Sequence, residues 1–295
     1  MVLVTGGTGF VGSNLIRELL SGPRPVRCLV RDPRKAEPLR KAGCELVRGD
    51  VTDLSTVLHA LTPEVDTVIH LVGILMQSAS ATFRDTHVMG TRNVVAACRG
   101  VGVKRYLHMS ALGTRMNAAS EYHRTKWEAE EIVRSSGLAY TIFRPSVIFG
   151  KEDRFTNTLA RAIKLSPVVM VPGNGRNLMQ PVFIKDVVAA FVSSMEMDAA
   201  RGRVFELGGP EAMTFDSLID AITHCLGKRR LKVHLPMSLM RLGASLFEAA
   251  LSYPPITRDA LVMLEEDNVT EDNALPSVFG VNPTPFAEGL KSYLR

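Results

Sequence analysis

The stretch Thr5-Gly6-Gly7-Thr8-Gly9-Phe10-Val11-Gly12 decides the fold of this chain. It follows an apolar run over residues 2–5 and opens a pattern with helical spacing. The glycines at 6, 9 and 12 permit, in turn, a tight turn, a close approach of the backbone to a pyrophosphate, and close packing of the helix on the sheet. The free N–H groups of the helix N-terminus favour bound phosphate. We therefore predict a dinucleotide site at Gly6, Thr8, Gly9, Phe10, Val11 and Gly12, with an unliganded glycine-rich turn as the alternative.

Strand-like apolar runs alternate with helical patterns through the first half of the chain. Continuous apolar runs are typical of parallel strands, because helices cover both faces of such a sheet. The predicted strands are residues 2–5, 26–30, 44–48, 67–72, 105–110 and 140–144, and the predicted helices are 11–20, 54–61, 86–99 and 121–135. This alternation predicts an α/β fold with a doubly wound parallel Rossmann sheet and right-handed crossovers.

The residue that follows the second predicted strand indicates which dinucleotide is bound. An NAD-specific site has Asp or Glu there, whereas this chain has Arg31, with Arg34 and Lys35 close behind. Asp32 points the opposite way if the strand alternation persists. A guanidinium can clamp a 2′-phosphate, which a carboxylate would repel. We therefore expect NADP(H) as the cofactor, with NAD(H) less favoured; the alternative is that Arg31 is a solvated loop residue.

Further cofactor contacts are expected where the next strands end. Asp50 and Val51 follow the third strand, at a position that suits an adenine-edge contact, although spacing alone indicates only a turn aspartate. His70-Leu71-Val72-Gly73 ends the fourth strand, and Gly73 lets the chain pass close to a cofactor. We expect His70 itself to be structural.

A Ser-Tyr-Lys set follows the fifth strand. Met109 and Ser110 lie at its carboxyl end, where open α/β sheets bind ligands, and Tyr122 and Lys126 share one helix face at i,i+4 spacing. A cation beside a phenol favours the phenolate and lowers the pKa of the tyrosine. Tyr122 is then the predicted general acid/base, Lys126 its electrostatic partner and Ser110 the donor to the substrate oxygen. A surface helix with a solvated lysine is the alternative.

The second half of the chain has a weaker pattern, which begins after about Gly150. We expect residues 1–150 to form the NADP(H)-binding Rossmann domain and residues 151–295 a smaller substrate lobe interwoven with it. Residues 171–175 are predicted to form a loop, 181–183 and 203–207 strands, and 186–195, a segment from Thr214, and 286–294 helices. For residues 236–251 we favour core packing; the alternatives are a lid over a lipid-like or quinone substrate and a membrane-surface helix.

The composition excludes several classes of protein. The 295 residues are 46% hydrophobic and 22% charged, unlike a disordered or collagen-like chain. The net charge of +5 comes from scattered Lys and Arg residues, typical of a solvated surface; a basic face for anionic lipid or nucleotide phosphate is the alternative. The four cysteines form no C-x-x-C pair and no zinc-type cluster, so we expect reduced thiols and no metal. We expect no signal peptide, no membrane span and no nucleic-acid partner, and a cytoplasmic location.

Taken together, these motifs resemble those of an atypical short-chain dehydrogenase/reductase. The resemblance implies that Pro145, Ser146 and Val147, in the stretch 144–150, meet the nicotinamide. More particular stretches resemble bacterial relatives of the nucleotide-binding accessory subunit of mitochondrial complex I, of which some are linked to coenzyme Q biosynthesis. These stretches are Glu152-Asp153-Arg154-Phe155, Gln180-Pro181-Val182, Asp186-Val187 and Pro255-Ile256-Thr257-Arg258-Asp259.

Two departures from the wider family bear on function. His87 stands where extended reductases and epimerases usually have Asn, and Arg31 stands where nucleotide-sugar epimerases usually have an acidic residue. We favour an oxidoreductase that acts on a small hydrophobic carbonyl or quinone-like molecule. The alternatives are a non-catalytic NADPH-binding accessory protein of a respiratory or quinone-synthesis complex and an NAD-dependent nucleotide-sugar epimerase or dehydratase. Association with a respiratory complex, peripheral binding to the inner face of the membrane, and oligomer formation are left open.

Overall fold

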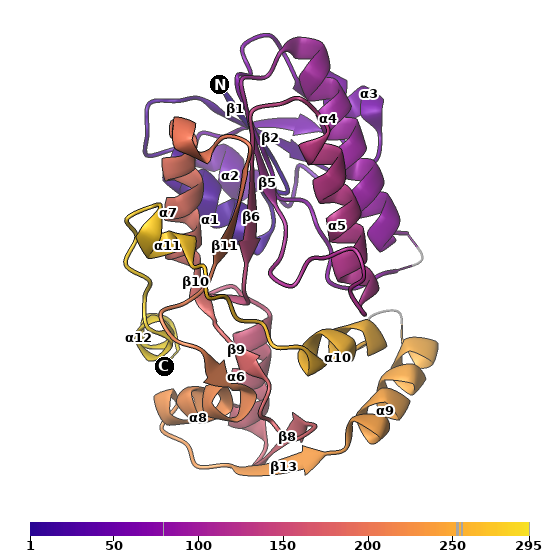
Figure 1. Cartoon of the computed structure of the whole chain (residues 1–295), viewed down its shortest axis with the longest axis vertical. Coiled ribbons are helices and arrows are strands. Elements are labelled where there is room, and N and C mark those ends of the chain that lie inside the picture. The colour runs from indigo at the N-terminus through magenta and orange to yellow at the C-terminus, as the bar shows by residue number, and fades with distance from the viewer. Residues whose placement is uncertain (79, 252–253, 255, 295) are drawn as a thin grey trace. The chain divides into compact units, whose positions relative to one another are not determined.

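The computed structural model describes residues 1–78, 80–251, 254 and 256–294 (Figure 1). Two compact units make up the chain, which passes from one to the other after Arg144, after Val187 and after Phe205. Unit 1 comprises Met1–Arg144 and Val188–Phe205, and unit 2 comprises Pro145–Val187 and Glu206–Arg295. Helix α7 (Ile184–Ser194) and strand β11 (Arg203–Leu207) both cross the boundary between these units.

A seven-stranded sheet forms the centre of unit 1, with the strand order β11-β6-β5-β4-β1-β2-β3. Every pairing among the first six strands of the sequence is parallel. The doubly wound sheet predicted from the sequence is therefore confirmed. The first six strands are β1 Val2–Thr5, β2 Val26–Val30, β3 Glu45–Arg48, β4 Thr67–His70, β5 Arg105–Met109 and β6 Tyr140–Pro145.

The central strands form because their side chains are buried on both faces, which favours continuous apolar runs. One face carries Leu3, Val68, Tyr106 and Ile142 from neighbouring strands, and these side chains belong to one hydrophobic core. On Figure 1, helices α3, α4 and α5 lie on one side of the sheet and α1 and α2 on the other. The order reverses between β1 and β4, and this reversal is the feature that opens a crevice at the carboxyl ends of the strands in such sheets.

The helices of unit 1 agree with the predicted pattern in all but two details. The short helix α2 was not predicted, and the helix predicted over residues 86–99 begins as a π-helical turn over Arg84–Met89 before it continues as α4. Such turns often lie at functional sites. The helices are α1 Phe10–Leu19, α2 Glu37–Lys41, α3 Leu54–Ala60, α4 Gly90–Val101 and α5 Glu121–Arg134, and a 3-10 turn spans Asp198–Ala200.

Unit 2 contains three two-stranded ribbons and a set of helices. The ribbons pair β7 (Ile148–Phe149) with β10 (Val182–Phe183), β8 (Val168–Pro172) with β13 (Leu231–Leu235), and β9 (Leu178–Met179) with β12 (Met213–Thr214). The helices are α6 Phe155–Leu165, α8 Phe215–Cys225, α9 Met237–Ala250, α10 Arg258–Glu265, α11 Ala274–Ser277 and α12 Phe286–Lys291. Pro255, from the stretch quoted above, lies outside the described residues.

The favoured interpretation of residues 236–251 as a core helix is wrong. Helix α9, all of whose residues the structure describes, buries Ala244 alone. Leu239, Leu242 and Leu246, spaced at three and four residues, are each more than half exposed. This spacing is typical of a helix that packs on a core. Among the described residues of unit 2, however, no element covers these three leucines.

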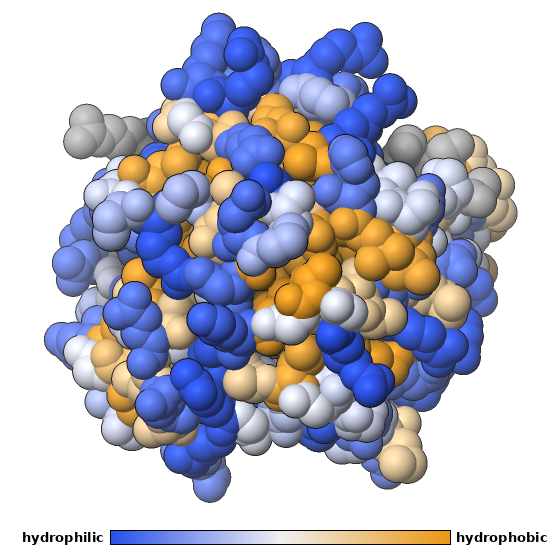
Figure 2. Space-filling view, turned by 90° about the horizontal axis from the view of Figure 1, so that it is seen from above, coloured by the Kyte–Doolittle hydropathy of each residue, from blue (hydrophilic) through white to orange (hydrophobic). Residues whose placement is uncertain are grey.

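The surface seen from above carries both hydrophilic and hydrophobic side chains. Figure 2 shows hydrophilic side chains around most of the rim of this face, with hydrophobic atoms interspersed among them. Of the helices within the described ranges, none is both long enough and apolar enough to span a bilayer.

A buried carboxylate ties helix α5 to strand β6. Glu130 is fully buried and accepts hydrogen bonds from Arg144 at 2.9 and 2.7 Å, and it also pairs with Arg134 one turn along the helix. Both guanidinium groups lie over the ring of Trp127, with the carbon of Arg134 4.8 Å from its centroid. Because α5 carries Tyr122 and Lys126, this cluster fixes the helix that bears the candidate site.

We expect Glu130→Gln to reduce the free energy of unfolding by about 3–5 kcal/mol, because it leaves buried cations uncompensated. Urea unfolding followed by circular dichroism would measure the change. The matched control is Glu131→Gln, since Glu131 also pairs with Arg134 but its side chain is 53% exposed. That control should change the stability by less than about 1 kcal/mol. Equal effects of the two variants would contradict the role of burial.

Candidate functional site

The glycine loop between β1 and α1 is packed too closely for side chains. A Cβ on Gly7 would lie 2.3 Å from Cys28 Sγ, and one on Gly12 would lie 2.3 Å from the carbonyl oxygen of Gly6. Gly6 has φ +79°, a conformation that favours glycine, and a Cβ there would meet the backbone of residues 71 and 72. The loop therefore brings the start of α1 directly against β1 and the end of β4.

The N-terminus of α1 has the properties of an anion site. Its N-cap is Gly9, which provides no side-chain hydrogen bond, and the first turn contains no acidic residue. The loop closes on itself through a 3.0 Å hydrogen bond from the Gly9 N–H to the Gly6 carbonyl. Thr8 and Gly9 are exposed, whereas Val11 is buried against the sheet. An uncapped helix start with open backbone N–H groups fits a pyrophosphate.

The charged residues after β2 differ in their partners. Arg31 is exposed, and among the described residues its side chain has no ion-pair partner. The Asp32 carboxylate accepts from the Arg34 backbone N–H at 3.1 Å and from its Nε at 3.3 Å. These hydrogen bonds lower the pKa of Asp32. The aspartate is thus turned toward Arg34, and Arg31 and Lys35 are exposed cations without an ion-pair partner among the described residues.

The residues after β3 and β4 lie in contrasting environments. Asp50 accepts hydrogen bonds from the Thr52 backbone N–H at 3.0 Å and from its hydroxyl at 2.9 Å, so its carboxylate closes a turn. Val51 is buried, and its side chain packs where a Cβ on Gly90 would lie. Leu71 is buried, Val72 half-buried and Gly73 exposed.

Lys126 is a buried cation at the end of β5. Its side chain is 2% exposed, and its Nζ donates to the Met109 carbonyl at 3.0 Å. Burial lowers the pKa of Lys126 to about 8, while the nearby Glu130 acts in the opposite direction. A Cβ on Gly73 would lie 3.0 Å from the same Nζ, so the ammonium also borders the segment after β4.

Ser110 directly follows β5, and Tyr122 lies one turn before Lys126 on α5. Both residues are buried. The Ser110 hydroxyl donates to Thr114 Oγ1 at 3.3 Å. Tyr122 lies among the rings of Phe83, His87 and His123, at centroid distances of 5.8, 5.4 and 5.3 Å.

The expected effect of Lys126 on the tyrosine is wrong for this state of the protein. Burial raises the pKa of Tyr122 above its ordinary value, because the phenolate would be desolvated among aromatic rings. The phenol is therefore protonated at neutral pH.

Buried histidines, among them His70 and His87, complete the polar surroundings of Lys126. His87 accepts the Ile74 backbone N–H at Nε2 (3.1 Å), and its Nδ1 lies 2.9 Å from Thr125 Oγ1 on α5. His70 Nδ1 lies 2.6 Å from Thr5 Oγ1. Burial, reinforced by Lys126, lowers the pKa of His70 to about 3 and that of His87 to about 2.

Both rings are therefore neutral and compatible with the buried ammonium. The sequence signal for His87 was its place where relatives usually have Asn. Only the folded chain shows that it joins the segment after β4 to helix α5.

The remaining predicted cofactor residues belong to unit 2. Pro145 and Ser146 are buried, and the Ser146 hydroxyl donates to Asn268 Oδ1 at 2.6 Å. The Val147 carbonyl accepts the Val182 backbone N–H at 3.0 Å. The Ser146 hydroxyl and the Val147 carbonyl are therefore already hydrogen-bonded within unit 2.

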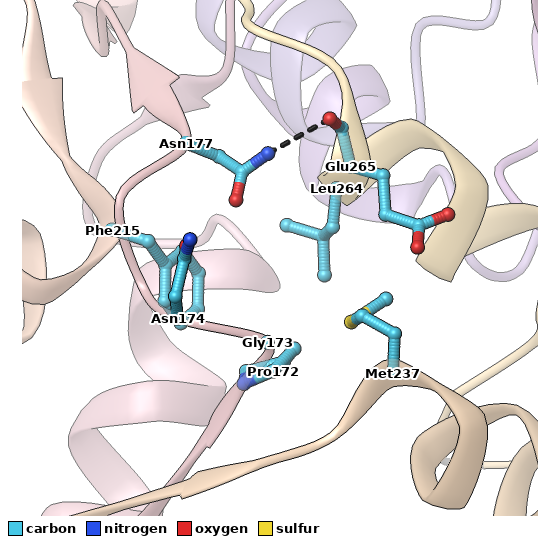
Figure 3. Close-up of a pocket in the computed structure, with 8 residues that line it drawn as sticks. All are labelled: Pro172, Gly173, Asn174, Asn177, Phe215, Met237, Leu264 and Glu265. Atoms are coloured by element: carbon cyan, nitrogen blue, oxygen red, sulfur yellow. Dashed lines mark hydrogen bonds between the residues drawn. The ribbon is translucent and has the colours of Figure 1, made fainter.

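Unit 2 also contains a pocket at the end of strand β8 (Figure 3). The side chains of Met237 and Leu264 point into it from α9 and α10, and Asn177 Nδ2 donates to the Glu265 carbonyl at 2.8 Å on its rim. The lining residues are Pro172, Gly173, Asn174, Asn177, Phe215, Met237, Leu264 and Glu265. No group of three His, Cys, Asp or Glu side chains in the described parts of the chain could hold a metal ion.

Known proteins are similar to this chain along most of its length. The mitochondrial NADH dehydrogenase [ubiquinone] 1 alpha subcomplex subunit 9 of Arabidopsis thaliana is 28% identical, over 92% of this chain and 71% of that protein. The N-acetyl-alpha-D-glucosaminyl-diphospho-ditrans,octacis-undecaprenol 4-epimerase of Escherichia coli O157:H7 is also 28% identical, over 84% of this chain and 78% of the epimerase. The predicted resemblance to complex I accessory subunits is confirmed.

The fold is also that of solved enzyme structures. The UDP-glucose 4-epimerase of Thermotoga maritima with UDP-glucose superposes with a TM-score of 0.78 at 19% identity, over 99% of this chain and 96% of that one. At this identity the likeness concerns the fold alone. The family model that matches residues 2–208 is described as the NAD dependent epimerase/dehydratase family. The glycine loop, the parallel sheet and this match over more than half of the sequence together show that the chain belongs to the NAD dependent epimerase/dehydratase family.

Proposed function

We propose that this protein is an NADP(H)-dependent oxidoreductase that acts on a hydrophobic carbonyl or quinone-like molecule. The observation that carries the proposal is the buried Lys126 ammonium at the carboxyl end of β5, one helical turn from Tyr122. Burying a lysine ammonium costs free energy, and buried groups with a shifted pKa are often found at functional sites. Its histidine neighbours are neutral, and the nearby Glu130 carboxylate is already paired with Arg144 and Arg134, so an anionic ligand beside Lys126 would be stabilised.

The chain's own residues would handle the proton of the reaction. NADP(H), when bound, supplies or accepts the hydride. Tyr122 is a protonated phenol, so it can donate a proton to a carbonyl oxygen in the direction of reduction. Ser110 would donate a second hydrogen bond to the same oxygen. Lys126 would stabilise the phenolate that remains after the proton has left.

The choice of NADP(H) depends on the charges after β2. Arg31 is exposed and unpaired among the described residues, and the Asp32 carboxylate is engaged by Arg34. A 2′-phosphate would therefore meet a guanidinium rather than an open carboxylate. The remaining contacts would come from the glycine loop, Asp50, Val51, Leu71–Gly73, Met109 and residues 145–147. In this proposal unit 1 supplies most of the contacts to the dinucleotide, and unit 2 selects the substrate.

A second candidate function is supported by the names of the relatives. The proteins that are 28% and 29% identical over 92% and 96% of this chain are subunits of mitochondrial NADH dehydrogenase. A non-catalytic NADPH-binding role in a respiratory or quinone-synthesis assembly, on the cytoplasmic side of a membrane, would follow from that likeness. The Tyr122–Lys126 pair favours catalysis over this role. Epimerase chemistry is less favoured because Arg31 disfavours NAD.

Tyr122→Phe should abolish turnover and leave NADPH affinity unchanged, because it removes the proton donor and keeps the ring. NADPH oxidation against a panel of quinones and hydrophobic carbonyls would measure turnover, and fluorescence titration would measure binding. Unchanged turnover in the variant would contradict the assignment of Tyr122 as the proton donor. Tight NADPH binding without turnover in either protein would instead support the accessory role.

Arg31→Asp should weaken NADPH binding about tenfold or more, because it removes a charge-assisted contact to the 2′-phosphate and introduces repulsion. NADH, which lacks that phosphate, should bind no more weakly than before. Titration calorimetry with both dinucleotides would measure the two affinities. Arg99→Asp provides a matched control, since Arg99 is an exposed arginine on α4 outside the predicted cofactor site. A native preference for NADH would contradict the cofactor assignment.

The pH dependence should follow the ammonium of Lys126. Burial lowers its pKa to about 8, so the charge is present below that pH and is lost as the pH rises through it. We expect kcat/KM for NADPH to fall above about pH 8, since this parameter reports on groups of the free enzyme. Lys126→Arg should move the fall to higher pH, because a guanidinium stays protonated. A native profile that stays flat through this range would contradict the role of the charge.

A further inference from the structure

The parallel ribbon β8–β13 of unit 2 has two unlike faces. Val169 and Val171 point to the buried side. On that side too, Lys232 pairs with Asp220 at 2.7 Å and His234 with Asp216 at 3.1 Å. The residues between them in each strand point the other way. Parallel strands are normally covered on both faces, so an open face on such a ribbon is unusual.

The open face is apolar. In the register of the ribbon, Leu231 pairs with Val168 and Val233 with Met170, so these four side chains share one face. Met170 and Leu231 are each 66% exposed, and Leu165, which precedes β8, is 80% exposed. We name Leu165, Val168, Met170, Leu231 and Val233 the ribbon patch. Contiguous exposed apolar surface of this kind marks an interaction site.

The two sequence segments that contain the ribbon carry only basic charges, while Asp216 and Asp220 of α8 pair with Lys232 and His234 on the side away from the ribbon patch. Residues 154–185 contain five Lys or Arg and no Asp or Glu, and residues 221–247 likewise contain five and none. The first segment includes β8 and the second includes β13. Two stretches of about thirty residues without a carboxylate are not expected in a chain with 30 acidic residues among 295.

The cations gather at one end of the ribbon. Because the strands are parallel, the turns that precede them meet at the same edge, as the 2.6 Å hydrogen bond from Arg230 Nε to the Ile163 carbonyl shows. Arg161 and Lys164 come before β8, and Lys228 and Arg229 before β13; all four side chains are exposed. Within the described residues, those of Lys228 and Arg229 have no carboxylate partner.

We propose that the ribbon patch and its basic edge form a docking surface for an anionic lipid bilayer. The aliphatic side chains would enter the boundary between headgroups and acyl chains, while Lys228 and Arg229 meet the lipid phosphates. Helix α9 follows β13 after Pro236, and its exposed leucines supply further apolar surface in the same unit. The inference is independent of the oxidoreductase activity proposed above.

Other occupants fit the ribbon patch less well. A second copy of the chain would cover the apolar centre, but its own ribbon patch and edge carry the same cations and would supply no carboxylate to pair with Lys228 and Arg229. Nucleic acid would be expected to meet a polar surface or stacked aromatic rings, whereas the centre of this patch is aliphatic. A bilayer with acidic headgroups satisfies both the apolar centre and the cationic edge.

Sedimentation of the full chain with lipid vesicles, in the absence of cofactor and substrate, tests the proposal. We expect it to sediment with vesicles of phosphatidylglycerol and phosphatidylcholine, far less with phosphatidylcholine alone, and less at high salt. Lys228→Gln combined with Arg229→Gln should weaken partition about fivefold for each cation removed. Met170→Asp should also weaken it, because it places a carboxylate in the ribbon patch.

Matched controls come from unit 1. Arg99→Gln combined with Lys104→Gln removes two exposed cations, and Leu58→Asp changes a leucine that is 47% exposed on α3. Neither control should alter vesicle binding. Equal sedimentation with neutral vesicles, or equal loss in the controls, would overturn the proposal. Failure of the native chain to sediment would overturn it as well and would direct the search to an acidic protein partner.

Discussion

The close contact of backbone with backbone at the glycine loop is the constraint on which the arrangement of unit 1 depends. Gly12 leaves no room for a Cβ beside the Gly6 carbonyl, and Gly7 leaves none beside Cys28 on the next strand. Helix α1 can therefore start at the end of β1 with its N-terminus open. Because β1 lies between β2 and β4, that N-terminus lies where the strand order reverses.

A second constraint is the burial of a charge. Lys126 has the Met109 carbonyl as a partner, and its burial lowers the pKa to about 8 although the nearby Glu130 acts in the opposite direction. His70 and His87 stay neutral for the same reason, since protonation would place a second cation in the same interior.

Unit 2 differs from unit 1 in how it treats apolar side chains. Phe149, Phe183 and Phe286 form a packed centre, with ring centroids 4.8 and 5.3 Å apart. The ribbon patch and the leucines of α9 remain outside that centre. The relatives named as subunits of a respiratory complex share this half of the chain, because the similarity extends over 92% or more of the sequence.

The sequence by itself determined the parallel sheet and the loop that binds phosphate in such folds. Glycine spacing and continuous apolar runs depend on local sterics and burial, which can be read from neighbouring residues. Only the tertiary structure decided the environment of the side chains. Tyr122 was expected to have a lowered pKa, and the rings of Phe83 and His87, distant in sequence, raise it by burial. The same holds for α9, whose helical spacing indicated a core that the fold does not provide. Burial depends on contacts between distant segments, and no local pattern records them.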